Sequence, residues 1–152
     1  MIEAWRITQR RFAAEAFTGE GARQFGGRWN RPGVSAVYLA QSRSLAILEV
    51  LVHLRRAEPI FDFVLIPAAF EEELVEALGD ESLPKNWDRE PPSIDTQILG
   101  DAWTVDGDRP VLSVPSAVVP EERNYILNPA HGLFSRIKIG LPVDCKMDKR
   151  LV

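Results

Sequence analysis

The chain has 152 residues, a length that suits one domain better than two. Its composition, 45% hydrophobic and 26% charged, is typical of a globular protein and excludes a disordered chain, a coiled coil and a collagen-like repeat. The longest apolar run covers residues 45–54 and is interrupted by Glu49 and His53. A membrane-spanning helix needs about 20 apolar residues, so we expect no contact with a membrane.

The charge balance argues against direct binding of nucleic acid. The net charge is -4 and the isoelectric point is near 5.3, whereas affinity for phosphates requires a basic surface. The first residues, MIEAWRITQRRF, lack the basic start and apolar core of a secretory signal. Cys145 is the only cysteine, which excludes an intrachain disulfide and a cysteine-based zinc site. These features together predict a cytoplasmic protein.

The first half of the chain contains strands, a long loop and one helix. Residues 3–8 are β-rich and are expected to open a sheet, and the glycine-rich residues 19–33 are predicted to form a long irregular loop. A short strand is predicted at 36–40 and a helix at about 43–54. That helix is apolar almost all round, a pattern typical of a buried helix.

The second half mixes short strands with two helices. It is expected to contain, in order, a central strand at 61–67, an acidic helix at 71–78, a loop at 79–92, a helix from Ser93 to about Thr104, strands at 111–114 and around Val118, and a closing strand at 134–139. No regular alternation of strand and helix is present. The sequence therefore predicts an α+β fold, with a compact mixed sheet and flanking helices.

Glu49 is the most informative residue of the predicted 43–54 helix. None of its neighbours three or four residues away carries a permanent positive charge. An unpaired carboxylate is costly to bury, so Glu49 must find a distant partner, line a hydrated cleft or stay protonated. Two interpretations remain open: a structural ion pair in the core, or a cleft carboxylate with a chemical task.

Arg28 lies in the sequence GGRWN, within the predicted loop. Glycines allow the backbone to approach a ligand closely, and the planar guanidinium fits phosphate or carboxylate groups. The pattern is neither a Walker loop nor a dinucleotide-binding fingerprint. Arg28 is therefore either an exposed loop arginine or an anion-binding residue.

The remaining candidates are weaker. Tyr38 is one of two tyrosines and is either a core aromatic of its strand or part of a site. His53 and His131 are far apart in an acidic chain, which argues against an acid–base ribonuclease. Cys145 has no histidine close to it in sequence and is expected to be inert.

Two segments resemble the RES-domain family in order and spacing. They are GGRWNRPGVSAVYLAQSRSLAILEVLVHL at residues 26–54 and VPSAVVPEERNYILNPAHGLFSRIKI at residues 114–139. The resemblance covers most of the chain and implies one RES domain over residues 1–152. RES proteins are toxins of type II toxin–antitoxin systems, their partner is an Xre-type helix-turn-helix antitoxin, and their fold is similar to that of diphtheria-toxin-like ADP-ribosyltransferases.

The resemblance assigns residues as well as an activity. Arg28, Tyr38 and Glu49 match the arginine, tyrosine and glutamate of the family. Ser116 matches its serine, with Ser135 as the competing choice. The implied activity is consumption of NAD as a substrate, by hydrolysis or phosphorolysis of its nicotinamide–ribose bond, with no prosthetic group and no metal.

The implied roles are consistent with residue chemistry. Nicotinamide leaves NAD as a neutral molecule, so no acid is needed to protonate it, and one carboxylate can stabilise the oxocarbenium-like state. Glu49 would hold the ribose, Arg28 would bind the phosphates, and Tyr38 would stack on the nicotinamide. Ser116 and Asn124 would orient the ribose or the pyrophosphate.

Two other functions stay open at this point. Transfer of ADP-ribose to a host protein would use the same site and leave a labelled protein as product. A catalytically silent module that only assembles with an antitoxin would leave cellular NAD unchanged.

Overall fold

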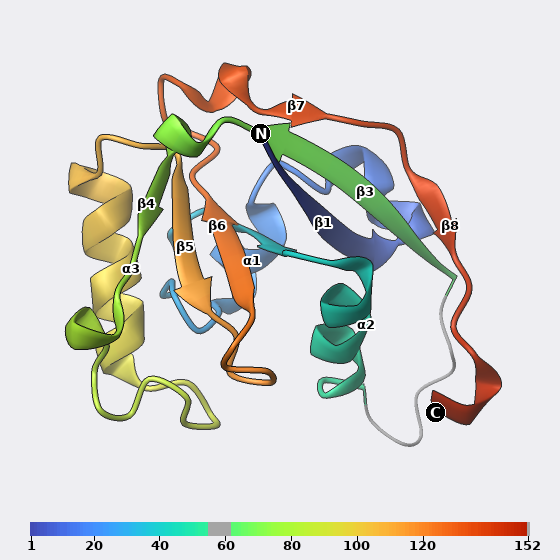
Figure 1. Cartoon of the computed structure of the whole chain (residues 1–152), viewed down its shortest axis with the longest axis horizontal. Helices are drawn as coiled ribbons and strands as arrows, with labels where there is room; N and C mark the ends of the chain where they lie inside the picture. The colour runs from blue at the N-terminus through green and yellow to red at the C-terminus, as the bar shows by residue number, and fades with distance from the viewer. Residues whose placement is uncertain (55–61, 152) are drawn as a thin grey trace.

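One curved β-sheet forms the centre of the protein in the computed structural model, which describes residues 1–54 and 62–151 (Figure 1). Its eight strands are β1 (Ile2–Gln9), β2 (Val37–Ala40), β3 (Phe63–Phe70), β4 (Val75–Ala77), β5 (Val111–Pro115), β6 (Arg123–Leu127), β7 (Lys138–Ile139) and β8 (Val143–Cys145). The strand order is β4-β5-β6-β2-β1-β3-β7, and β8 also pairs with β3. Only β4 and β5 pair in parallel among these strands.

Three α-helices flank the sheet within the described residues: α1 (Glu20–Phe25), α2 (Arg43–Leu51) and α3 (Ile94–Asp106). The start of α2 packs on β1 and β2, because Leu45 and Ala46 contact Trp5 and Ala40. α3 packs on another part of the sheet through Trp103, in a cluster that also contains Tyr38 of β2. Tyr38 and Ala40 are two residues apart on one strand and share a face. α2 and α3 therefore lie against the same face of the sheet.

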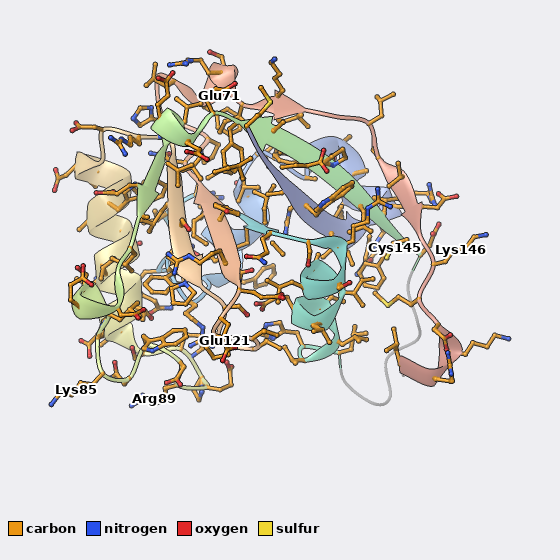
Figure 2. The ribbon with its side chains drawn as sticks, in the orientation of Figure 1. Glu71, Lys85, Arg89, Glu121, Cys145 and Lys146 are labelled. Atoms are coloured by element: carbon orange, nitrogen blue, oxygen red, sulfur yellow. The ribbon has the colours of Figure 1, made fainter. Side chains whose placement is uncertain are left out.

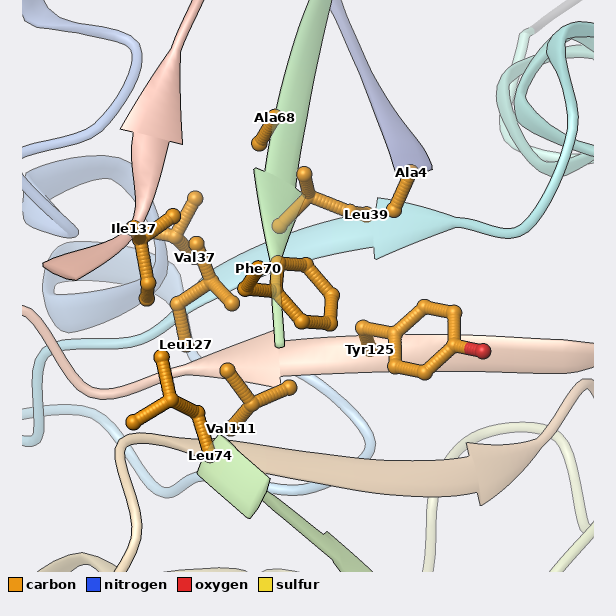
Figure 3. Close-up of a cluster of buried hydrophobic side chains, with 10 residues drawn as sticks. All are labelled: Ala4, Val37, Leu39, Ala68, Phe70, Leu74, Val111, Tyr125, Leu127 and Ile137. Atoms are coloured by element: carbon orange, nitrogen blue, oxygen red, sulfur yellow. The ribbon is translucent and has the colours of Figure 1, made fainter. Parts of the chain in front are cut away.

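The opposite face carries a second core. Phe70 of β3 packs edge-on against Tyr125 of β6, with ring centroids 5.4 Å apart, and Val37 and Leu127 lie in the same cluster (Figure 3). β1 and β3 pair along their whole length, from Ile2 opposite Phe70 to Gln9 opposite Phe63. Both faces of the central strands are thus covered, which fixes their register.

The α+β prediction is confirmed, but one helix is wrong. Residues 71–78 were expected to be an acidic helix, whereas the chain makes a short 3-10 turn at Glu72–Leu74 and then enters β4. Leu74 is buried and Val75 pairs with Val111 of β5. The helical pattern was misleading because tertiary pairing with β5 outweighs the weak local preference of so short a segment.

Two further predictions for the first half need correction. The region 19–33 is not wholly irregular, because it contains the six-residue α1. The helix predicted at 43–54 ends at Leu51, and it is not buried all round: Leu48 and Val52 are exposed. The sheet covers only one side of α2, so its apolar pattern did not indicate complete burial.

In the second half, α3 and β5 are confirmed, and Ser93 caps α3 by accepting a hydrogen bond from the N–H of Thr96. The strand expected around Val118 is a turn, and the strand expected at 134–139 shrinks to the two residues of β7. β6 was missed altogether. The predicted central strand at 61–67 corresponds to β3, except that residue 61 lies outside the described residues. No helix in the described ranges has the length and apolar character needed to cross a membrane.

We expect Gly100→Ala to destabilise the fold. A Cβ at Gly100 of α3 would lie 1.7 Å from the carbonyl oxygen of Trp29, so helix and loop would have to separate. Overpacking of this kind costs about 1–3 kcal/mol or more. Urea unfolding monitored by circular dichroism measures the loss.

Gly21→Ala is the matched control, because Gly21 is also helical but has no neighbour within 4 Å of an added Cβ. Its stability should be unchanged or rise by up to about 1 kcal/mol, the helix preference of alanine. Equal stability of the two variants would contradict the close packing of α3 on the Trp29 backbone.

Candidate active site

Glu49 lies at the centre of a small hydrogen-bonded group between α2 and the sheet. One turn before it, Leu45 is completely buried and anchors α2 on β1. The Oε1 atom of Glu49 accepts hydrogen bonds from Ser116 Oγ and from Asn124 Nδ2, both at 2.7 Å. Neither donor is charged, and no cation pairs with Glu49 in the part of the chain that the structure describes. The structure therefore shows a carboxylate held by neutral donors rather than an ion pair.

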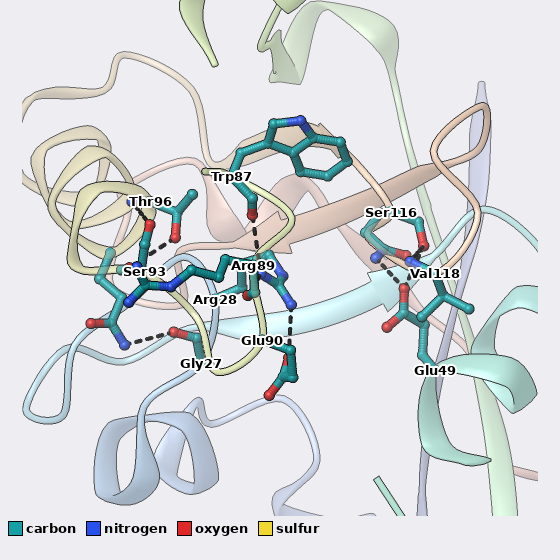
Figure 4. Close-up of polar contacts among 12 residues, drawn as sticks. Gly27, Arg28, Glu49, Trp87, Arg89, Glu90, Ser93, Thr96, Ser116 and Val118 are labelled. Carbon is teal, nitrogen blue, oxygen red and sulfur yellow. Dashed lines mark hydrogen bonds and ion pairs between the residues drawn. The ribbon is translucent and has the colours of Figure 1, made fainter. Parts of the chain in front are cut away.

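Ser116 is fully buried where the chain leaves β5. Its hydroxyl donates to Glu49 and accepts hydrogen bonds from the N–H groups of Val118 and Val119, at 3.0 Å each (Figure 4). One donor and two acceptor positions are all that a hydroxyl has. Ser116 thus orients Glu49 and has no lone pair available to act as a nucleophile.

Asn124 reaches Glu49 from β6. In the register of the sheet it lies opposite Ala40 of β2 and Val114 of β5. Its Nδ2 group is used on Glu49, and its Oδ1 atom is buried without a hydrogen-bond partner within the described residues. A buried acceptor without a partner costs about 1–3 kcal/mol and calls for an explanation. Asn124 is thus kept beside Glu49 at a cost in stability.

Arg28 is not the exposed loop arginine that the sequence allowed. Its side chain is only 15% exposed. Nη1 donates to the carbonyl oxygens of Trp87 and Arg89, at 3.0 and 2.7 Å, and Nη2 donates to Glu90 Oε2 at 3.0 Å (Figure 4). The guanidinium therefore holds the loop before α3, and its only anionic partner among the described residues is the exposed Glu90.

Tyr38 lies close to Arg28 in space, although it belongs to β2. Its hydroxyl donates to Asn30 Oδ1 at 2.6 Å and accepts from the N–H of Trp29 at 3.0 Å. Burial raises the pKa of Tyr38 above its ordinary value of 10.0, so the phenol stays protonated at neutral pH. The hydroxyl is used inside the protein, which leaves the ring as the part available to a ligand.

A cleft of about 410 Å³ opens between two loops near these residues. Lys85 and Trp87 line it from the loop before α3, and Pro115 and Glu121 line it from the β5–β6 connection; Figure 2 shows Lys85 and Glu121 on these neighbouring loops. Trp87 is also the residue whose carbonyl binds Arg28, and Pro115 directly precedes Ser116. The cleft thus lies next to both groups, although neither Arg28 nor Glu49 is among the residues that line it.

The other sequence candidates lie elsewhere. Ser135, the competitor of Ser116, is exposed in a 3-10 turn and makes no contact with Glu49. His131 accepts a hydrogen bond from the N–H of Leu133, and His53 is exposed. Burial raises the pKa of the Cys145 thiol, consistent with an inert residue. No group of three metal-binding side chains occurs in the described ranges.

Sequence reasoning missed the residues that support Arg28. Asn30 is 1% exposed and hydrogen-bonded through its whole amide, and Gln97 and Asp101 of α3 bind the same loop. Of these three residues, only Asn30 could have been recognised from the sequence. An asparagine between GGRW and a proline turn is typical of a side chain that hydrogen-bonds to the backbone.

These features define an α+β protein with a partly buried carboxylate held by neutral donors and an arginine held by the loop before α3. The particular family follows from comparison with known proteins: the chain belongs to the RES domain family, whose match spans residues 3–148.

Relatives of known name extend this assignment. The chain is 40% identical to Toxin Res of Photorhabdus laumondii, over 97% of this chain and 96% of that protein. It is 39% identical to the Prs ADP-ribosylating toxin of Sphingobium sp., over 84% and 82%. A shorter match, 54% identical over 37 residues, joins 24% of the chain to 20% of the NAD(+) phosphorylase MbcT of Mycobacterium tuberculosis.

A solved structure shares the fold. The chain superposes on a chain of the crystal structure of the M. tuberculosis MbcT-MbcA toxin-antitoxin complex with a TM-score of 0.77. The two are 22% identical, and the match covers 95% of this chain and 84% of the other. This likeness establishes the architecture independently of close sequence similarity.

Asn124→Asp tests the group around Glu49 through the pH dependence of stability. A second carboxylate there would raise the pKa of the pair in the folded state, because two adjacent negative charges repel. When the pKa of a carboxyl group is higher in the folded state than in the unfolded state, the free energy of unfolding decreases as pH rises. The deficit relative to the unchanged protein should be small near pH 4 and grow toward pH 7, by about 1.4 kcal/mol per unit of pKa shift.

Asn86→Asp is the control, since Asn86 also donates to a carboxylate, that of Asp95, but in an exposed pair. Solvent screening should make its pH dependence much weaker. Both variants are measured by urea unfolding from pH 4 to 8. Parallel stability curves would contradict the contact between Asn124 and Glu49 in a partly buried pair.

Proposed function

We propose that this protein is the toxin of a bacterial toxin–antitoxin pair and that it depletes cellular NAD by cleaving the nicotinamide–ribose bond. The observation that carries the proposal is a single carboxylate, Glu49, fixed by two neutral donors. A nearby cleft is lined by Pro115, which precedes Ser116, and by Trp87, whose carbonyl binds Arg28. Membership of the RES family and the names of the relatives support it.

The chemistry needs only one carboxylate. Because nicotinamide departs as a neutral molecule, bond cleavage requires stabilisation of the positive charge that develops on the ribose. Ser116 and Asn124 hold Oε1 of Glu49, and the second oxygen, Oε2, accepts no hydrogen bond from the described residues. Oε2 therefore takes the ribose hydroxyls and faces the developing cation. Neutral donors orient the carboxylate without cancelling its negative charge, whereas a lysine in their place would cancel it.

Arg28 binds the pyrophosphate of NAD in this proposal. Substrate phosphates then replace Glu90, an exposed carboxylate, whereas the two backbone carbonyls can remain bound. The Tyr38 ring stacks on the nicotinamide, and Asn124 and Ser116 orient the ribose through the Glu49 carboxylate that they hold. Water or inorganic phosphate completes the reaction at the ribose carbon. No prosthetic group or metal takes part.

The proposal also covers the domain, its fold relationship, its location and its partner. We place the chain as one RES domain over residues 1–152, akin to diphtheria-toxin-like ADP-ribosyltransferases, and acting in the cytoplasm, where its substrate is abundant. Its partner is an Xre-type helix-turn-helix antitoxin. A carboxylate or backbone oxygen of that partner would occupy Arg28, because a guanidinium that binds phosphate binds carboxylate equally well.

A second function uses the same site. A relative named Prs ADP-ribosylating toxin is 39% identical, which favours transfer of ADP-ribose to a protein as the alternative. Free ADP-ribose or its phosphorylated form as product supports NAD cleavage, whereas a labelled protein supports transfer. A silent antitoxin-binding module would produce neither.

Glu49→Gln tests the proposed reaction. Expression of the unchanged chain without an antitoxin should arrest growth and deplete NAD, and purified protein should release nicotinamide. The glutamine keeps size and hydrogen bonding but removes the charge, so turnover should fall by roughly 10²–10³-fold. The KM for NAD should change less, because the charge acts mainly in the transition state.

Glu76→Gln, on the exposed side of β4, serves as the control of equal charge change and should keep full activity. Melting temperatures accompany each assay. A destabilised Glu49→Gln protein with full turnover would show that Glu49 is structural. Growth arrest at normal NAD levels would reject NAD depletion in favour of protein modification.

Glu90→Gln should improve substrate binding. If phosphates displace Glu90 from Arg28, removal of its charge eliminates a competitor, and the KM for NAD should fall about two- to five-fold, the scale of an exposed ion pair. Asp88→Asn removes an equal charge two residues away in the same loop and should leave KM within experimental error. A higher KM in Glu90→Gln alone would instead mean that Glu90 holds the loop in its working position.

A further inference from the structure

The loop that carries Arg28 has little regular structure of its own. Gly27 and Asn30 form an isolated β-bridge, closed by a hydrogen bond of 3.0 Å from Gly27 N–H to Asn30 O, and Arg28 and Trp29 are the two residues of the turn between them. A two-residue turn with a single backbone hydrogen bond does not define where its arginine points. Other contacts must supply that direction.

Asn30 supplies the first of these contacts. Its side chain is buried, and Nδ2 donates to the carbonyl oxygens of Ala22 and Val34, at 2.9 Å each. Oδ1 accepts from the Tyr38 hydroxyl at 2.6 Å. Both donors and the acceptor of the amide are thus used inside the protein, and a fully satisfied buried polar group is rigid.

The Tyr38 hydroxyl supplies the second contact, from inside the turn. It accepts a hydrogen bond from the N–H of Trp29, the residue next to Arg28. A Cβ at Gly27 would lie 2.6 Å from the same oxygen, so the turn backbone packs directly on the hydroxyl. A glycine is required at this position because no side chain would fit.

One face of α3 holds the turn from outside. Gln97, Gly100 and Asp101 are spaced by three and four residues and therefore share a helix face. Gln97 Nε2 donates to the carbonyl of Gly27 at 3.0 Å, and Asp101 accepts from the backbone N–H and from Nε of Arg31, at 3.1 and 2.6 Å. Gly100 provides the space for the Trp29 backbone. The turn is thus clamped between α3 and the tyrosine.

We propose that Asn30 and the Tyr38 hydroxyl are positioning groups, which set the Arg28 guanidinium at a fixed place relative to Glu49. The link runs through β2: two residues after Tyr38, Ala40 lies opposite Asn124, whose amide holds Glu49. The Tyr38 hydroxyl takes no part in the bond chemistry. This inference rests on the proposed function, since it assigns Arg28 to the NAD phosphates.

A double-mutant cycle tests the proposal on the purified full chain. Tyr38→Phe keeps the ring and removes the hydroxyl, so kcat/KM for NAD should fall about tenfold, mostly through KM, because Glu49 is untouched. If the hydroxyl acts through Arg28, the same change made in an Arg28→Ala background should alter kcat/KM less than twofold. The fluorescent analogue 1,N6-etheno-NAD, assayed with and without inorganic phosphate, makes the slow variants measurable.

Tyr125→Phe is the matched control, because Tyr125 is the only other tyrosine, lies on the opposite face of the sheet and should keep full activity. Gln97→Ala is a second probe that removes a single partly buried hydrogen bond, in case Tyr38→Phe is unfolded at the assay temperature. It should raise KM about threefold, and that effect too should vanish without Arg28.

The outcomes separate the two proposals. Normal kcat/KM in Tyr38→Phe, or a loss that persists in the Arg28→Ala background, overturns the positioning role while the NAD reaction stands. Absence of NAD consumption by the unchanged chain rejects the proposed function instead. In that case the ¹⁵N–¹H resonance of Arg28 Nε decides on positioning without any substrate: it should shift or broaden in Tyr38→Phe and not in Tyr125→Phe, and identical spectra would overturn the inference.

Discussion

The carboxylate of Glu49, held by two neutral donors, is the constraint on which the arrangement of this protein depends. A single oxygen accepts from both Ser116 and Asn124, which come from the end of β5 and from β6. Three elements must therefore meet within hydrogen-bonding distance of one atom. The pairing of β5 with β6 sets the two donors side by side, and the packing of Leu45 on Trp5 places α2 above them. A shift of any of these elements would leave a partly buried charge without its hydrogen-bond donors, which is costly.

The arginine side of the site is built on different elements. Its turn rests on α3 and on the Tyr38 hydroxyl, and its guanidinium binds the loop before α3. β2 is the one strand common to both sides, since Tyr38 serves the turn and Ala40 pairs with the strand of Asn124. Two supports joined by a central strand therefore hold the two charges at separate places in the fold.

The sequence predicted the elements whose pattern is local. β1, β2, β5 and α3 are marked by alternating or helical apolar residues and by the Ser93 cap, and Glu49 was recognised because its helix offers it no cation. β6 was missed because RNYIL is short and starts with two polar residues. β6 forms through pairing with β2 and β5, strands that are distant in sequence on at least one side. The acidic segment before β4 was misread for the same reason, since the pairing of β4 with β5 is not encoded locally.

The site residues could not be predicted from local sequence patterns alone. Composition and spacing left Arg28, Tyr38 and Ser116 open, and the family resemblance selected them. Neither source indicated that the Ser116 hydroxyl has no free lone pair, or that the hydroxyl of Tyr38 is consumed by Trp29 and Asn30. Such statements depend on the hydrogen-bond inventory of each atom, which only the packed structure supplies.

The site also leaves stabilising contacts unmade. Arg28 and Glu49 carry opposite charges but do not pair with each other, and Asn124 Oδ1 is left without a donor in the described part of the chain. A direct ion pair would bring the two charges together and fill the space that a substrate must enter, at a desolvation cost that often cancels its gain. Because each charge is held by neutral or exposed partners instead, the space for the substrate is not filled by an ion pair. A carboxylate held without a cation is then a stability cost that a polar, hydroxyl-bearing ligand would relieve on binding, so the feature that weakens the fold is the one that favours the substrate.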